Sequence, residues 1–301
     1  MAALSFRLRH PVRFVESGYS RRGFRVSDDH HADHSPGRYK PVRRAPVREP
    51  AFNVPGVVLA VIAVLAAVHA LREFFPDDDA SVMLSLAFIP ARLTLMFDPG
   101  RAQELFEAAF AGGGVQMALT RFILSEGSAP WSVATYALLH GSWMHLAFNA
   151  LWLLAFGTPV ARRFGVVRFL LLFLAATIAG SLFYWVMRPL DVTPMVGASG
   201  AISGVMAAAV RFVFGPGRAT AFGRSAPSVL YAPAQPLSGL LENRQALGFI
   251  IAWLVINLLA GFASGAFGAD GAIAWEAHIG GFLAGLALFR VLDPVPRAAA
   301  R

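Results

Sequence analysis

Long apolar segments separated by short basic loops are the feature that most constrains this 301-residue chain. A bilayer core is about 30 Å thick, and a helix needs about 20 mostly apolar residues to cross it. Five segments are long and apolar enough, and they comprise residues 51–71, 133–157, 167–187, 247–267 and 272–291. We therefore predict an all-α membrane protein with several transmembrane helices.

The composition agrees with a membrane protein. Hydrophobic residues make up 56% of the chain, charged residues make up 15%, and the mean hydropathy is +0.56. These values exclude an ordinary soluble domain. The net charge of +8 would suit nucleic acid, but the basic residues lie between apolar segments instead of forming one basic face. We expect the lipid bilayer as a partner and no nucleic acid.

A sixth apolar segment, residues 199–214, is too short to span a bilayer alone. At about 1.5 Å per residue, its 16 residues reach about 24 Å. One of its ends must therefore lie below the membrane surface. Counting this segment, we predict a bundle of six transmembrane helices.

The distribution of basic residues orients the six helices. The first 50 residues hold 11 Arg or Lys against 5 Asp or Glu, which predicts a disordered basic tail in the cytoplasm. The loops on the same side of the predicted bundle contain Arg162, Arg163, Arg168, Arg211, Arg218, Arg224, Arg244, Arg290, Arg297 and Arg301. Both termini are therefore predicted to be cytoplasmic, with a tail (1–50), a membrane domain (51–292) and a short C-terminus (293–301).

The long first loop, residues 72–130, lies on the outer side in this topology. It contains two apolar stretches, Val82 to Ile89 and Ala118 to Leu124, that are too short to cross the membrane. We expect both stretches to lie in the outer interface. The linker 215–245 is rich in Gly, Pro, Ser and Arg, which predicts a flexible cytoplasmic loop.

Polar residues inside the predicted spans are candidates for function, because burying them in lipid is costly. Three clusters stand out, in the second, fourth and sixth spans: His140, His145 and Asn149; Gly197-Ala198-Ser199-Gly200; and Ala277-His278-Ile279-Gly280-Gly281. These three spans run from outside to inside in the predicted topology. All three clusters are therefore expected in the outer third of the bilayer, where they would form one site.

Ser199 opens the short fourth span. If the helix begins there, residues 194–198 enter the outer leaflet as irregular backbone, which is tolerated only where protein covers it or water fills a cavity. The unpaired N–H groups and the positive dipole end at a helix N-terminus would stabilise an oxyanion. His145 and Asn149 are four residues apart, share one helix face, and are candidate donors to the same oxyanion.

Small residues predict close contact between the fourth and sixth spans. Gly200 and Gly204, like Gly281 and Gly285, have the four-residue spacing that lets membrane helices approach closely. This packing would bring Ser199 beside His278, which would act as general base. Glu276 and Asp270, the nearby carboxylates in the sequence, are not expected to orient His278. The residues therefore favour a dyad over a triad.

These motifs resemble those of the rhomboid family of intramembrane serine proteases. The resemblance covers residues 51–292 and implies Ser199 as nucleophile, His278 as base, His145 with Asn149 as oxyanion donors, and His140, Gly197, Gly200 and Gly281 as structural residues near the site. It implies no cofactor and no metal. It also implies that the substrates are single-pass membrane proteins cut near the outer ends of their helices, and that residues 268–272 form a cap. An Ala-, Arg- and Gly-rich composition favours a bacterial inner membrane.

The sequence departs from the family pattern at two positions. Many members carry a Trp-Arg pair in the first loop, and here the matching residues are Trp131-Ser132. In many members a tyrosine that packs against the histidine follows the serine by four residues, whereas here Ser203 occupies that position.

Three other functions are weighed against a protease. A non-catalytic rhomboid-like protein would bind membrane segments without cutting them, although such relatives typically lack the serine or the histidine. A zinc site built from His140, His145 and His278 lacks a carboxylate ligand and the HExxH pattern. A transporter is disfavoured because no inverted repeat is evident.

Overall fold

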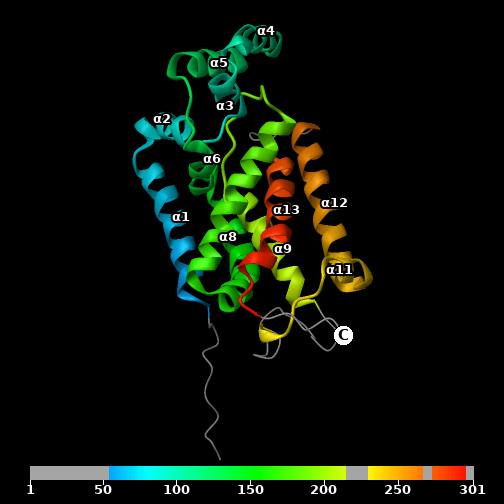
Figure 1. Cartoon of the computed structure of the whole chain (residues 1–301). Coiled ribbons are helices and arrows are strands. Elements are labelled where there is room, and N and C mark those ends of the chain that lie inside the picture. Colours follow the sequence, from blue (N-terminus) through cyan, green and yellow to red (C-terminus); the bar gives the residue numbers. More distant parts are fainter. Residues whose placement is uncertain (1–53, 215–229, 267–272, 296–301) are drawn as a thin grey trace, which may run out of the picture. The chain divides into compact units, whose positions relative to one another are not determined.

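The computed structural model describes residues 54–214, 230–266 and 273–295, and every regular element within these ranges is a helix (Figure 1). The predicted tail, the predicted cap at 268–272, and residues 215–229 of the predicted linker lie outside the described residues. An all-helical fold is therefore confirmed for the described part of the chain.

The helices follow one another along the chain with short connections. Their bounds are α1 (Gly56–Phe74), α2 (Pro76–Leu86), α3 (Pro90–Phe97), η1 (Pro99–Arg101), α4 (Ala102–Gly112), α5 (Gly114–Glu126), α6 (Ser132–Thr135), η2 (Tyr136–Leu138), α7 (Trp143–Trp152), η3 (Leu153–Gly157), α8 (Thr158–Met187), α9 (Ser199–Val213), α11 (Leu237–Glu242), α12 (Arg244–Ala266) and α13 (Trp275–Leu292).

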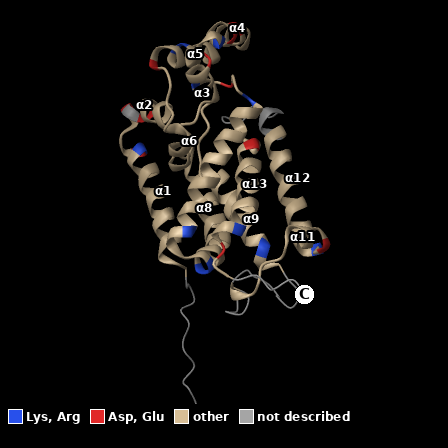
Figure 2. Ribbon diagram, in the orientation of Figure 1, with Lys and Arg blue, Asp and Glu red and all other residues tan. Residues whose placement is uncertain are grey.

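Four helical stretches among the described residues are long and apolar enough to cross a membrane: Gly56–Phe74, Trp143–Met187, Arg244–Phe262 and Trp275–Leu292. A shorter apolar helix, Ser199–Val213, accompanies them. Charged residues gather toward the two ends of these helices, and the central turns are largely uncharged (Figure 2). The architecture is that of a multi-pass membrane protein.

The second predicted span differs from the structure at its start. Residues 132–138 form the short helices α6 and η2, and the continuous helix begins at Trp143. Ser142 sets this boundary, because its hydroxyl accepts a hydrogen bond from the backbone N–H of His145 at 3.1 Å. The helix then continues through η3 into α8 without a gap, although Gly165 has a positive φ of 74° that changes its direction.

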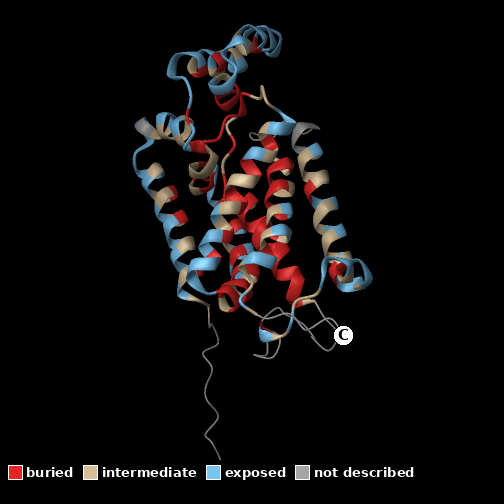
Figure 3. Cartoon of the chain, in the orientation of Figure 1, coloured by how far each residue is buried: buried red, intermediate tan, exposed pale blue. Residues whose placement is uncertain are grey.

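The short helix α9 is the most deeply buried element. Every residue from Gly200 to Val213 is buried, and the helix packs against α8 and α13 (Figure 3). A Cβ atom on Gly285 of α13 would lie 2.1 Å from the carbonyl oxygen of Gly204 on α9. The glycine pairs therefore allow the close helix contact predicted from their spacing.

Buried Arg92 holds the first loop together. It is 4% exposed, its Nε donates to the carbonyl of Gly127 at 2.7 Å, and its Nη1 donates to the carbonyl of Leu84 at 3.0 Å. These bonds connect α3 to the ends of α2 and α5. Trp131 also bonds to the carbonyl of Ser85 through its indole nitrogen. Arg92 thus supplies a buried guanidinium to the loop in which Ser132 replaces the expected arginine.

Candidate active site

Ser199 and His278 are hydrogen-bonded. Ser199 is the first residue of α9, and its Oγ lies 2.7 Å from Nε2 of His278, which is in the first turns of α13. Both side chains are half-buried. The sequence predicted this pairing from the topology and the glycine spacing, and the geometry suits proton transfer between the hydroxyl and the imidazole.

The segment before Ser199 is irregular and held by backbone bonds. Met195 and Phe88 exchange two hydrogen bonds, N to O at 2.8 and 3.0 Å, and the N–H of Gly197 donates to the carbonyl of Tyr136 at 3.0 Å. Gly197 has a φ of 114°, a conformation that L side chains rarely adopt. Backbone bonds from the first loop and from η2 therefore hold the segment that precedes α9.

The imidazole of His145 lies against Gly197. A Cβ atom on Gly197 would be 2.7 Å from Nε2 of His145 and 3.8 Å from Oγ of Ser199. Glycine is thus required between the two side chains. His145 of α7 is therefore in contact with the segment that precedes Ser199.

Asn149 lies one turn after His145 on α7 and is buried. Its Nδ2 donates to the carbonyl of His145 at 3.0 Å. Because an amide nitrogen carries two hydrogens, this bond uses only one of them. Its second N–H is therefore able to donate to another acceptor.

His140 precedes α7 instead of lying within it, which corrects its predicted place in the second span. It is fully buried, and its carbonyl accepts a hydrogen bond from Nη1 of Arg72 at 2.9 Å. Its ring packs edge-on against His145, with a centroid separation of 5.1 Å. The backbone carbonyl of His140 thus makes the contact with α1. The His140 ring packs against the ring of His145.

Asn257 is a member of the site that the sequence reasoning missed. Its Oδ1 contacts Nδ1 of His278, on the opposite side of the ring from Ser199. A lone asparagine in an otherwise apolar span was the available signal, since a polar residue at this depth is a functional candidate by default.

The two other polar neighbours of the site bond elsewhere. The hydroxyl of Ser203 donates to the carbonyl of Ser199 at 2.8 Å, within α9. Glu276 is buried and accepts a hydrogen bond from Nε of Arg188 at 2.5 Å. As predicted, Glu276 does not orient His278.

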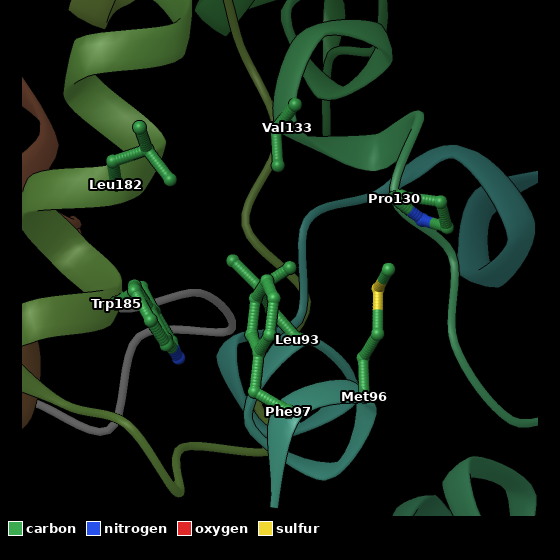
Figure 4. Close-up of a pocket in the computed structure, with 7 residues that line it drawn as sticks. All are labelled: Leu93, Met96, Phe97, Pro130, Val133, Leu182 and Trp185. Atoms are coloured by element: carbon green, nitrogen blue, oxygen red, sulfur yellow. The ribbon is translucent and has the colours of Figure 1, made fainter.

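No group of three or more His, Asp or Glu side chains that could hold a metal ion occurs within residues 54–214, 230–266 and 273–295. An apolar pocket of about 400 Å³ lies between the first loop and α8. Figure 4 shows the residues that line it, Leu93, Met96, Phe97, Pro130, Val133, Leu182 and Trp185. None of these is a predicted site residue, so the pocket is separate from the Ser199 cluster.

Comparison with known proteins points to the family that the sequence motifs resemble. Residues 127–293 match the family described as "Rhomboid domain". The chain is 47% identical over 78 residues to rhomboid protease GluP of Bacillus subtilis (strain 168), a match that covers 26% of this chain and 15% of GluP.

Two other matches extend over more residues at lower sequence identity. The chain is 29% identical over 170 residues to rhomboid protease AarA of Providencia stuartii, covering 52% of this chain and 53% of AarA. It is 30% identical over 212 residues to rhomboid-like protease 3 of Toxoplasma gondii, covering 69% of this chain and 62% of that protein. In each case the match spans less than two thirds of the relative's own length.

Proposed function

The chain belongs to the Rhomboid domain family, and on that basis we propose that it is an intramembrane serine endopeptidase that acts through a Ser199–His278 dyad. The observation that carries the proposal is the 2.7 Å hydrogen bond between Oγ of Ser199 and Nε2 of His278, at the N-terminus of a buried helix. Named rhomboid proteases among the similar proteins support it.

The proposed topology has six spans with both termini in the cytoplasm. The 45-residue stretch Trp143–Met187 would contribute two of them, because it is about twice the length that one crossing needs. Its positive-φ residue, Gly165, would mark the cytoplasmic turn. With the shorter α9 counted as a span, the described helices supply six. The proposed domains remain a tail (1–50), a membrane domain (51–292) and a C-terminus (293–301).

In the proposed first step, Ser199 attacks the carbonyl carbon of the scissile peptide bond. Its hydroxyl proton passes to Nε2 of His278, and the carbonyl oxygen becomes an oxyanion. The Ser199 N–H, the imidazole of His145 and the amide of Asn149 would stabilise this charge. The His278 imidazolium then gives its proton to the leaving amine, and an acyl-enzyme remains.

Water completes the reaction. His278 takes a proton from a water molecule, the resulting hydroxide attacks the acyl carbon, and Ser199 leaves with the proton returned to its oxygen.

The proposed substrates are single-pass membrane proteins, cut near the outer ends of their transmembrane helices. An extended stretch of substrate, unwound from its helix, would have to reach Ser199 at the start of α9. We propose the bacterial inner membrane as the location. No cofactor enters the proposed reaction.

The deciding experiment is cleavage of a labelled single-pass substrate in liposomes by the wild type, Ser199→Ala and His278→Ala. Both variants should lose cleavage while keeping the unfolding temperature of the wild type, and a chelator should change nothing. Ser125→Ala, at an exposed position of α5, is the matched control and should cleave normally.

A non-catalytic protein that binds membrane segments is the alternative. It would show no cleavage of any substrate in a panel, and Ser199→Ala would preserve its function in the cell. Cleavage that persists in folded Ser199→Ala would also overturn the proposed dyad.

A further inference from the structure

We propose that Asn257 is a positioning residue that fixes the orientation and tautomer of His278, so that the working unit is Ser199–His278–Asn257. The inference rests on the proposed function. It adds a neutral amide, contributed by α12, to the site on α9 and α13 (Figure 1).

The hydrogen bonds of Asn257 determine which way its amide faces. Its Nδ2 donates to the carbonyl oxygen of Trp253 at 2.7 Å, and a carbonyl can only accept. Oδ1 must therefore face His278, because the flipped amide would place two acceptors against each other. The direction of the amide is thus set by the backbone of α12 itself.

The amide in turn determines where the imidazole carries its proton. Since Oδ1 of Asn257 only accepts, Nδ1 of His278 must donate to it. In a neutral imidazole the other nitrogen, Nε2, then has a free lone pair. That nitrogen faces the hydroxyl of Ser199 at 2.7 Å, which is the arrangement a general base requires.

Asn257 is unusual in α12 because it is both polar and buried. Among residues 244–262 of α12, only Ala246 and Asn257 are buried. Burying an amide is unfavourable unless it is hydrogen-bonded. Within residues 244–262, one of the two buried residues of α12 is therefore polar and contacts the proposed base.

Neighbouring contacts hold α12 in register with α13. Trp253 stacks on Phe282 with ring centroids 4.3 Å apart. One turn further along α12, Asn257 meets His278, and after one more turn a Cβ atom on Gly261 would lie 2.4 Å from Trp275. The Asn257 bond is therefore flanked on both sides by contacts between the same two helices.

Asn257 also compensates for the short side chain at position 203. The serine at that position is too short to pack across the ring of His278, and its hydroxyl is bonded to the carbonyl of Ser199. Another group must then restrain the imidazole. Asn257 does so through its contact with Nδ1 of the ring.

The test compares Asn257→Leu and Asn257→Asp with the wild type, by the pH dependence of kcat and KM for a transmembrane substrate in liposomes. In Asn257→Leu we expect kcat to fall by about 10- to 100-fold with KM unchanged, by analogy with the loss seen when the hydrogen-bond partner of a metal-bound histidine is removed. The acidic limb of the rate profile should move to lower pH, because the imidazolium loses an acceptor for its Nδ1 proton.

Asn257→Asp should move the acidic limb the other way, to higher pH, because a carboxylate stabilises the imidazolium more strongly than an amide does. Ile256→Ala is the control, since this neighbour on α12 is 65% exposed and points away from the site. It should keep the kcat and the pH profile of the wild type.

The outcomes distinguish a failure of the proposed function from a failure of the positioning role of Asn257. If the wild type does not cleave, the proposed function fails. If the wild type cleaves and folded Asn257→Leu has the same kcat and the same acidic limb, only the positioning role fails. Should Asn257→Leu not fold, an unmoved acidic limb in Asn257→Asp would overturn the positioning role by itself.

Discussion

Gly281 of α13 is in backbone contact with Gly200 of α9: a Cβ atom on Gly281 would lie 1.9 Å from the Gly200 carbonyl oxygen. Gly200 directly follows Ser199, and Gly281 is less than one helical turn after His278. The separation of the two helices at this point therefore sets the distance between the serine hydroxyl and the imidazole.

Replacing Gly281 by alanine should separate the helices and weaken the dyad. We expect Gly281→Ala to lower the free energy of unfolding by about 1–3 kcal/mol, because the added methyl group would overlap backbone atoms that cannot rotate away. Proteolytic activity should fall more than the folded fraction does. Unfolding in mixed micelles and cleavage in liposomes measure the two effects.

The matched control for this change is Gly248→Ala on α12. Nothing lies within 4 Å of a Cβ atom at Gly248, and alanine favours a helix over glycine by about 0.5–1 kcal/mol. Gly248→Ala should therefore be neutral or slightly stabilising. Equal stability of the Gly281 and Gly248 variants would show that the contact between α9 and α13 is not tight.

The proposed oxyanion donors make a second prediction. His145→Ala and Asn149→Ala should each lower kcat by about 10²–10³ with little change in KM, as removal of one oxyanion donor does in serine proteases. Phe148→Ala, on the same helix and 55% exposed, should cleave normally. A loss that appears only in KM would mean that these side chains bind substrate without stabilising the oxyanion.

Order and spacing in the sequence were enough to predict that Ser199 lies beside His278. Ser199 begins α9 as expected, and glycine spacing predicted that α9 and α13 touch. Asn257 escaped prediction because its role depends on which face of α12 meets α13, and an apolar helix has no amphipathic pattern to reveal that face. His140 was misplaced because apolar residues 133–142 resemble a span, whereas Ser142 caps the helix later.

Arg163 is another residue whose contacts could not be predicted from the sequence. Its position in a basic loop was interpreted as a topology signal, which says nothing of contacts. In the structure its side chain is fully buried and bonded to Asp293, 130 residues later in the sequence. Nothing in the sequence around Arg163 or Asp293 indicates that the two residues are paired.

A third prediction concerns Arg92 in the first loop. Arg92→Met would leave the carbonyls of Leu84 and Gly127 without their donor, and unsatisfied buried groups cost about 1–3 kcal/mol each. We expect faster proteolytic nicking between residues 84 and 127 and weaker substrate cleavage. Arg121→Met, at an exposed position of α5, is the control and should resist nicking like the wild type. Identical nicking rates for the two variants would exclude Arg92 as the organiser of the loop.

The fourth prediction tests the pair formed by Arg163 and Asp293. Two hydrogen bonds of 2.7 Å join the guanidinium to both carboxylate oxygens, and the side chains are 0% and 10% exposed. Asp293→Ala leaves the arginine charge buried without its partner, which should cost about 3–5 kcal/mol.

The double variant Arg163→Met with Asp293→Ala removes both charges, so it should be destabilised by less than the sum of the two single variants. Unfolding of all three in mixed micelles measures this difference, with exposed Arg168→Met as the control for loss of a basic residue. Additive single effects would mean that the two charges do not interact. The packing of Arg163 over Phe212, at 4.7 Å from the ring centroid, would then be the main contribution of its side chain.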